Sequence, residues 1–217
     1  MKSKHTKFFF ISLPFLLCIS MAVFMILNRE TDINELAKCK LNTTASTFED
    51  FKGDFSLVNE DGLTVSSDHL LDQPSLLYFG YTFCPDICPF DLMRNAQAVE
   101  LLALEDITIK PLFISVDPSR DSPSVLKNFT SFHHPNMIGL TGSTKQLDRV
   151  KNIYKVYSEI PKDMTADYIV NHSTFSYFIL PKLGVQTYFT RSQKPKELAS
   201  KMKCIIDTKL SNPENTK

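Results

Sequence analysis

The chain has 217 residues, enough for one domain of ordinary size and an additional segment. Its 24 Lys and Arg balance 24 Asp and Glu, so the composition gives no basis for a nucleic-acid partner. Five cysteines are too few for a fold built on disulfides, but they are compatible with an oxidising compartment in which one or two pairs matter.

The N-terminal region predicts a membrane anchor. Residues 1–7 contain three lysines, and residues 8–27 (FFFISLPFLLCISMAVFMIL) contain no charge. Twenty residues at the rise of an α-helix span about 30 Å, the thickness of a bilayer core. The lysines before this segment predict that residues 1–7 are a cytoplasmic tail and that the body lies outside the membrane. A cleaved signal peptide is the alternative, since Ser20-Met21-Ala22 resembles a cleavage site, although the apolar run continues past it.

Residues 28–47 are polar and lack periodicity, which predicts a tether between the anchor and a folded domain at residues 48–210, with a short tail at 211–217. Three cysteines lie away from the centre of the domain. Cys18 is expected to be a small apolar residue within the anchor. Cys39 in the tether and Cys204 near the C-terminus could pair, although no spacing argument requires it.

The body alternates predicted strands and helices. A hairpin with a turn ending at Gly62 comes first, followed by a short apolar strand at 76–79 and a helix at 91–104. Further elements are expected at 107–116 (strand), 123–132 (helix), 137–140 (strand), 144–157 (helix), 175–180 with 185–190 (hairpin) and 194–209 (helix). This order indicates an α/β fold of the thioredoxin-like kind, with a mixed sheet covered on both faces by helices.

Two thiols, Cys84 and Cys88, follow the first central strand directly. Pro85 suits the first turn of a helix, so we expect a helix to begin there, with both thiols on one face about 6 Å apart. The N-terminus of a helix lowers thiol pKa values. The spacing permits either a disulfide or two sulfur ligands to one metal, and a pair of buried structural cysteines is the plainer alternative.

His172 is the expected third member of the site. It comes just before a predicted buried strand, in the loop that faces the dithiol helix in thioredoxin-like folds. A histidine that only begins the strand is the alternative. Two thiolates and one imidazole suit a soft metal; structural zinc and iron–sulfur sites usually need four protein ligands, so copper fits best. The other histidines are expected at the surface: His5, His69, His133 and His134.

Three charged residues follow the next strand, and we expect Arg120 with Asp117 and Asp121 to fix the turn before the 123–132 helix. Asp86, between the two thiols, is expected to favour the start of the dithiol helix.

Four separated motifs occur in order along the body: YFGYTFCPDICP at 78–89, FISVDPSRDSP at 113–123, GLTGS at 139–143 and DYIVNHS at 167–173. In these motifs the chain resembles the Sco/SenC family of membrane-anchored, thioredoxin-like copper proteins, and the similarity extends from about residue 48 to the last helix. The resemblance implies that Cys84, Cys88 and His172 bind one copper ion. Asn171 stands where the family commonly has aspartate, so an amide without charge replaces a carboxylate beside the imidazole.

The resemblance also implies a role in building the binuclear copper centre of cytochrome c oxidase. We expect a copper chaperone that delivers copper to the copper-receiving subunit; the alternative is a thiol–disulfide oxidoreductase that reduces that subunit's cysteines. A peroxidase-like use of Cys84 or Cys88 is a third reading. Dithiol oxidoreductases use C-x2-C with a cis-proline opposite, whereas residues 168–180 contain no proline. The expected location is a bacterial inner membrane with the domain in the periplasm, and a mitochondrial inner membrane is the alternative.

Overall fold

The structure is a computed structural model that describes residues 20–21, 39, 51, 53–161 and 167–210. Residues 42–207 form one compact unit, which contains every element discussed below except the end of the last helix. The predicted anchor at 8–27 lies outside the described residues except for Ser20 and Met21, and the predicted tether lies outside them except for Cys39. Within the described part of the chain, no helix is both long enough and apolar enough to cross a bilayer.

Seven strands form one mixed sheet in the order β2-β1-β5-β4-β3-β8-β9. The three central strands, β5, β4 and β3, are parallel, and the strands on both sides of them run antiparallel to their neighbours. The strands are β1 (Ser56–Asn59), β2 (Thr64–Ser66), β3 (Ser75–Gly80), β4 (Lys110–Ser115), β5 (Ile138–Thr141), β8 (Ser176–Leu180) and β9 (Gly184–Phe189).

Strand β3 lies at the centre of the fold, between β4 and β8, and all six of its residues are buried. A continuous apolar run is the sequence pattern of a strand that is covered on both faces. The parallel register places Gly80 of β3 opposite Ser115 of β4, so the carboxyl ends of these two strands lie side by side. The loops that leave these ends therefore meet at one edge of the sheet.

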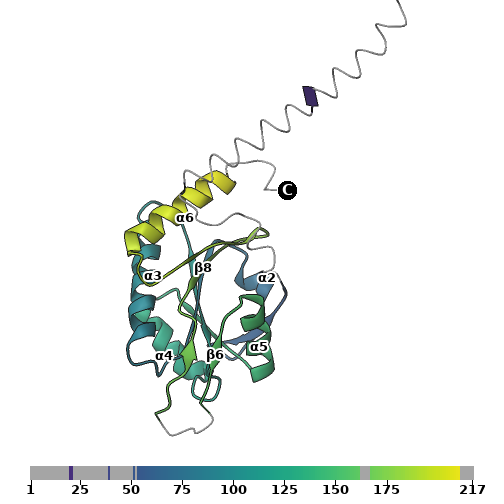
Figure 1. Cartoon of the computed structure of the whole chain (residues 1–217), viewed down its shortest axis with the longest axis vertical. Helices are drawn as coiled ribbons and strands as arrows, with labels where there is room; N and C mark the ends of the chain where they lie inside the picture. The colour runs from purple at the N-terminus through teal and green to yellow at the C-terminus, as the bar shows by residue number, and fades with distance from the viewer. Residues whose placement is uncertain (1–19, 22–38, 40–50, 52, 162–166, 211–217) are drawn as a thin grey trace, which may run out of the picture. The chain divides into compact units, whose positions relative to one another are not determined.

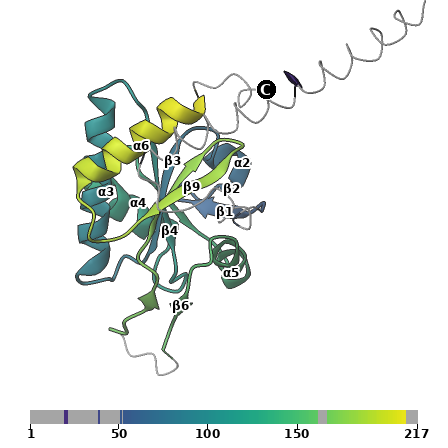
Figure 2. The same cartoon turned by 45° about the horizontal axis from the view of Figure 1, so that its top comes forward.

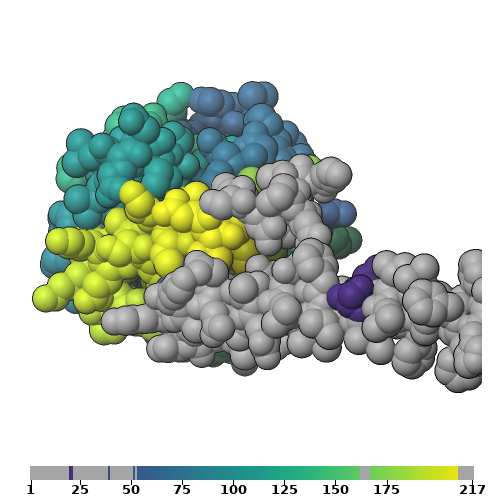
Figure 3. All heavy atoms as spheres, turned by 90° about the horizontal axis from the view of Figure 1, so that it is seen from above, coloured from purple at the N-terminus to yellow at the C-terminus, as the bar shows by residue number. Residues whose placement is uncertain are grey.

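Helices cover both faces of the sheet, as the sequence predicts. Helices α3 (Ile87–Ala103) and α4 (Pro123–His133) contact each other on one face, and α2 (Ser67–Leu70) and α5 (Thr144–Ile153) lie on the other (Figures 1 and 2). The connections β3-α3-β4 and β4-α4-β5 both join parallel neighbours and step across the sheet in the same direction. Because such connections are right-handed as a rule, their helices lie on the same face. The last helix, α6 (Pro195–Leu210), lies beside α3 (Figure 2). In the space-filling view its yellow surface adjoins teal surface of the domain (Figure 3).

Aromatic rings fill the core on the α5 side of β3. The ring of Phe79 packs against the rings of Tyr154 and Tyr177, with centroids 5.7 and 6.1 Å away. Tyr154 also meets Phe55 edge to face at 6.2 Å, which joins the β1 region to the same cluster. Contacts between aromatic rings stabilise the folded state beyond the burial of their apolar surface. This cluster therefore helps to fix the position of β3 between its neighbours.

The predicted order of the main strands and helices is confirmed. The prediction that a helix begins at Pro85 is wrong. Helix α3 begins at Ile87, with Asp86 in a non-helical conformation (φ −140°, ψ −61°) at its N-cap. Cys84 instead donates its backbone N–H to Tyr81 O at 3.3 Å, which closes a turn before the helix. Pro85 therefore belongs to this turn, and only Cys88 lies on the helix.

Three short elements were also not anticipated. Strands β6 (Ser158–Glu159) and β7 (Asn171–His172) pair as a separate two-stranded sheet. The third is helix α2, which carries His69; this histidine is exposed, as predicted. Polar elements this short leave no hydrophobic periodicity in the sequence, because tertiary contacts rather than burial of a face hold them.

We predict that Gly80→Ala destabilises the domain by about 1–3 kcal/mol through overpacking. A Cβ at this position would lie 2.9 Å from both the Cys88 Sγ and the Phe113 Cε2 atoms, and neither group has room to move. Urea unfolding of the reduced protein measures the change. The control is Gly142→Ala, where the nearest atom is the Gln146 Oε1 at 3.1 Å on a more flexible side chain. Equal stabilities for Gly80→Ala and the wild type would contradict the prediction.

Candidate metal site

The loop that carries Cys84 leaves the carboxyl end of β3 and is held by Asp121, which comes from the turn after β4. The Asp121 carboxylate accepts hydrogen bonds from the Thr82 backbone N–H at 3.2 Å, from Thr82 Oγ1 at 2.6 Å and from Ser115 Oγ at 2.5 Å. Asp121 is fully buried, and burial raises the pKa of its carboxyl group. The Asp121 side chain, which was expected to fix its own turn, therefore fixes the neighbouring dithiol loop to the end of β4.

The two thiols are adjacent although only one of them is helical. The Cys88 backbone N–H, in the first turn of α3, donates to the Cys84 Sγ at 3.3 Å. The sulfur thus satisfies an N–H that a helix start leaves without an intrahelical partner. The Asp86 side chain makes no such capping bond. Cys84 is 8 % exposed and Cys88 is 0 % exposed, and both are free thiols.

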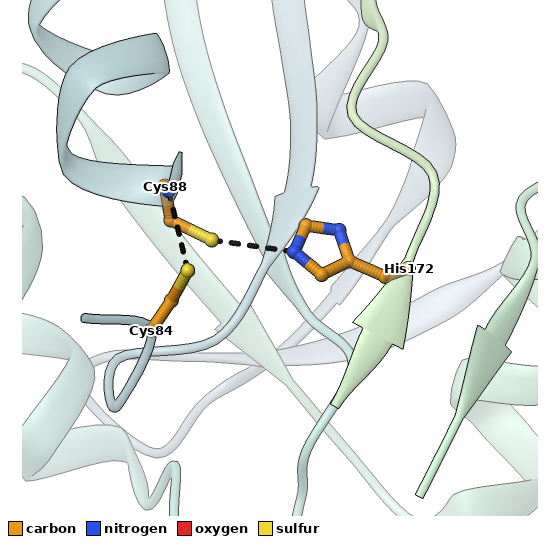
Figure 4. A group of neighbouring side chains, drawn as sticks. All are labelled: Cys84, Cys88 and His172. Atoms are coloured by element: carbon orange, nitrogen blue, oxygen red, sulfur yellow. Dashed lines mark hydrogen bonds between the residues drawn. The ribbon is translucent and has the colours of Figure 1, made fainter. Parts of the chain in front are cut away.

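His172 points toward these thiols from β7, although it is 84 residues distant from Cys88 in sequence (Figure 4). Its Nε2 lies 3.4 Å from the Cys88 Sγ, and its Nδ1 lies 2.9 Å from the Ser173 carbonyl oxygen. A carbonyl only accepts, so Nδ1 carries the proton of the neutral ring. The Nε2 lone pair is then directed at the thiols, which is the tautomer that a metal ligand requires.

Two tyrosines hold the imidazole in place. The rings of Tyr78 and Tyr81 both meet the His172 ring edge to face, with centroids 6.3 and 5.8 Å away. The Tyr81 hydroxyl also accepts the backbone N–H of Val170, two residues before the histidine, at 3.3 Å. Because β3 and its extension supply both tyrosines, the central strand positions the histidine as well as the thiols.

The two thiols differ in acidity. Hydrogen bonds from the Cys88 thiol and from the Cys88 backbone N–H hold the pKa of Cys84 far below that of an ordinary thiol, against the opposing effect of burial. The hydrogen bond to Cys84, together with burial, raises the pKa of Cys88. Of the two sulfurs, Cys84 is therefore the one favoured as a thiolate, and Cys88 is the one favoured as a thiol.

These three side chains could hold a metal ion. Their ligand atoms (two sulfurs and one nitrogen) all lie within 4.8 Å of one another. Metal–sulfur and metal–nitrogen bonds of about 2.3 and 2.0 Å would separate three trigonal ligands by roughly 4 Å, so one ion fits between them with little movement. Two thiolates and one imidazole form a soft donor set, of the kind that selects Cu(I) over hard cations.

A polar network behind Cys88 was not anticipated from the sequence. The Tyr78 hydroxyl donates to the Asp91 Oδ2 at 3.0 Å, and the Arg94 guanidinium lies 3.5 Å from the Asp91 Oδ1. Burial raises the pKa of Asp91, against the opposing charge of Arg94. Asp91 and Arg94 are buried on α3, as is Leu92. Charged residues next to the apolar residues of an amphipathic helix are the sequence signal that could have revealed this network.

The other singled-out residues lie elsewhere. His134, expected at the surface, is buried and pairs with Glu100 at 3.0 Å. His133, also expected at the surface, is the last residue of α4 and is half-buried. Burial lowers the pKa of His133. Cys39 and Cys204 are each disulfide-bonded, in contrast to the two thiols of the site.

The fold and this cluster define a thioredoxin-like domain with side chains suited to a soft metal. The family model described as SCO1/SenC matches residues 43–207. The chain therefore belongs to the SCO1/SenC family. It is similar to Protein SenC of Rhodobacter capsulatus, with 40 % identity over 91 % of this chain and 87 % of that protein.

Solved structures support the same fold. Copper-bound ScoI of Arabidopsis thaliana has a TM-score of 0.67 and 34 % identity, and the match covers 71 % of this chain and 98 % of that one. BsSco has a TM-score of 0.56 and 26 % identity, and the match covers 70 % of this chain and 90 % of that one. BsSco is described as a member of the Sco family of cytochrome c oxidase assembly proteins, with a disulfide switch.

We predict that iodoacetamide modifies Cys84 before Cys88 in the reduced apo protein. The lowered pKa of Cys84 keeps it a thiolate, so its rate should change little between roughly pH 5 and 8, where the rate of an ordinary thiol rises about tenfold per unit. Mass-mapped alkylation over this range measures both rates. A steep rise for Cys84 toward pH 8, or faster modification of Cys88, would show that the proposed order of acidity is wrong.

Proposed function

We propose that this protein is a copper chaperone that binds one copper ion through Cys84, Cys88 and His172 and delivers it to the copper-receiving subunit of cytochrome c oxidase during assembly. Copper is here the cargo, and the domain holds it between acquisition and transfer. The donor set fits Cu(I) by its softness, and an imidazole nitrogen is also acceptable to Cu(II).

The observation that carries this proposal is the convergence of the three ligand atoms within 4.8 Å. Two segments far apart in sequence supply them, and each has its own support: the Asp121 contacts for the dithiol loop and the Tyr81–Val170 hydrogen bond for the histidine. A redox dithiol alone needs no histidine whose Nε2 lone pair is directed at the sulfurs. The extra ligand therefore favours metal binding.

The surroundings of Cys84 suit transfer of the ion. Its neighbours Phe83 and Pro85 are exposed, whereas Cys88 lies behind it in the core. A ligand of a recipient protein can therefore approach from the Cys84 side. Stepwise replacement of the ligands keeps the copper bound throughout its transfer.

The recipient is proposed from the family. BsSco is described as belonging to a family of cytochrome c oxidase assembly proteins, and ScoI of Arabidopsis thaliana was solved with copper bound. We extend both properties to this chain, since it has the family's fold and a donor set suited to a soft metal.

A second candidate function is reduction of the recipient's cysteines, and the unequal acidity of the thiols favours it. The Cys84 thiolate would attack a disulfide sulfur of the recipient, which breaks that S–S bond and releases a recipient thiolate that takes up a proton. Cys88, after losing its proton, would then attack the Cys84 sulfur and release the second recipient thiolate. The recipient gains two electrons, and Cys84 and Cys88 become a disulfide.

We further propose that residues 8–27 anchor the chain in a bacterial inner membrane, with residues 48–210 as the copper-binding domain in the periplasm. The support is the uncharged run of twenty residues, the preceding lysines and the similarity to a bacterial SenC protein. A mitochondrial inner membrane is the alternative location.

For the copper site, we predict that the wild-type domain binds one Cu(I). The His172→Ala variant should bind it at least about 10–100-fold more weakly, which is the loss seen when a residue that only orients a metal ligand is replaced. Competition titration with a Cu(I) chelator measures the affinity. His69→Ala is the matched control, because His69 is an exposed histidine in α2. Cys84→Ser and Cys88→Ser should also abolish tight binding.

Equal affinities of His172→Ala and wild type would contradict the three-ligand site. The same variants separate the two candidate functions, because disulfide reduction requires both thiols but not the imidazole. A purely redox protein would reduce a disulfide of the recipient equally fast with and without His172. A chaperone would lose copper transfer to the recipient in the His172→Ala variant.

For the location, we predict that the full chain expressed in a bacterium stays with the membranes after alkaline extraction, whereas a chain that begins at Asn28 is released. In spheroplasts, added protease should digest the domain of the full chain. Release of the full chain would exclude the anchor, and protection of an intact domain from protease would exclude a periplasmic location.

A further inference from the structure

The guanidinium of Arg120, in the turn after β4, lies among three aromatic rings beside the candidate metal site. Its central carbon is 3.5 Å from the ring centroid of Tyr168, 4.9 Å from that of Phe83 and 5.5 Å from that of Tyr81. A cation within about 6 Å of a ring centroid is attracted to the ring, and a planar guanidinium can also stack on it.

These rings belong to the two segments that carry the candidate ligands. Tyr81 and Phe83 lie in the loop that reaches Cys84, and Phe83 is its immediate neighbour in sequence. Tyr168 lies four residues before His172. Arg120 therefore contacts both segments at once from a third one, the turn that follows β4.

Asp117 holds the guanidinium and one of the rings in this arrangement. The Arg120 Nε donates to the Asp117 Oδ2 at 2.5 Å, and the Tyr168 hydroxyl donates to the two Asp117 oxygens at 2.7 and 2.9 Å. Asp117 is fully buried at the end of β4. The ion pair and the hydroxyl thus attach the histidine segment to the central sheet.

The remaining contacts of Arg120 are with ring faces rather than with acceptors. Among buried side-chain nitrogen and oxygen atoms of the described residues, the Arg120 Nη2 is the one without a hydrogen-bond partner. A buried N–H group is costly to leave unpaired, and the nearby aromatic faces offset part of this cost. A lysine could keep the charge near Asp117 but has no planar face for the rings.

We propose that Arg120 is a positioning residue that clamps the Cys84 loop to the His172 segment and so keeps the three ligands close enough for one ion. The expected effect of Arg120 on copper affinity rests on the proposed copper site. The contacts of Arg120 with the two segments exist in the metal-free protein. Its role goes beyond fixing the turn in which it lies.

The test compares Arg120→Lys with the wild type. Arg120→Gln alone is unsuitable, because it would leave the Asp117 carboxylate buried without its ion pair. A second variant, Asp117→Asn with Arg120→Gln, replaces the pair by two neutral amides and provides a test if the lysine variant does not fold. Leu147→Ala is the control: Leu147 is buried in α5, a helix that contacts β1, so its loss destabilises the domain away from the site.

The first readout is amide hydrogen exchange of the metal-free protein. The Val170 N–H should lose protection in Arg120→Lys relative to the Leu140 N–H of β5, because its bond to the Tyr81 hydroxyl joins the clamped segments. Leu147→Ala should instead lower the protection of globally exchanging amides together. Unchanged protection of Val170 relative to Leu140 in both Arg120 variants would overturn the clamp.

The second readout is Cu(I) affinity, which should fall about 10–100-fold in Arg120→Lys, as for other residues that orient metal ligands, and stay unchanged in Leu147→Ala. Wild-type affinity in a destabilised Arg120→Lys would mean that Arg120 supports only the fold, and it would overturn the positioning role. If the wild type itself binds no copper, the proposed function fails, whereas the hydrogen-exchange result still decides whether the clamp exists.

Discussion

The parallel pairing of β3 with β4 is the constraint on which the candidate site depends. It places Gly80 opposite Ser115, so the loop that carries Cys84 and the turn that carries Asp121 leave the sheet side by side. The Asp121 carboxylate can then hold Thr82, and the dithiol loop acquires a defined path to α3. The aromatic core around Phe79 keeps β3 itself in place, so packing of the sheet determines where the sulfurs lie.

The same geometry gives the two thiols different chemistry. The Cys84 sulfur accepts the first-turn N–H of Cys88 and is stabilised as a thiolate, while Cys88 lies in the core with a raised pKa. A nearby imidazole with its Nε2 lone pair toward the sulfurs completes a soft donor set. The proposed metal binding and thiol exchange would both use these two sulfurs, so a disulfide and a bound copper ion would exclude each other. The redox state of the pair would therefore control loading.

The hydrophobic pattern predicted most of the fold, because strands such as β3 and helices such as α5 bury continuous or periodic apolar faces. The motifs also predicted which side chains would meet, since Cys84, Cys88 and His172 do converge. The later start of α3 could not be predicted, because it depends on a turn closed by the Tyr81 carbonyl. The Arg120 contacts were missed for a similar reason: they join three segments that only the folded sheet brings together.

The central claim is that one copper ion is held by two sulfurs and one imidazole nitrogen. X-ray absorption spectroscopy of the Cu(I)-loaded domain measures this ligand set directly. The account predicts two sulfur neighbours and one nitrogen neighbour, with the nitrogen contribution lost in the His172→Ala variant. A spectrum with sulfur neighbours alone, or one that the loss of His172 does not change, would contradict it.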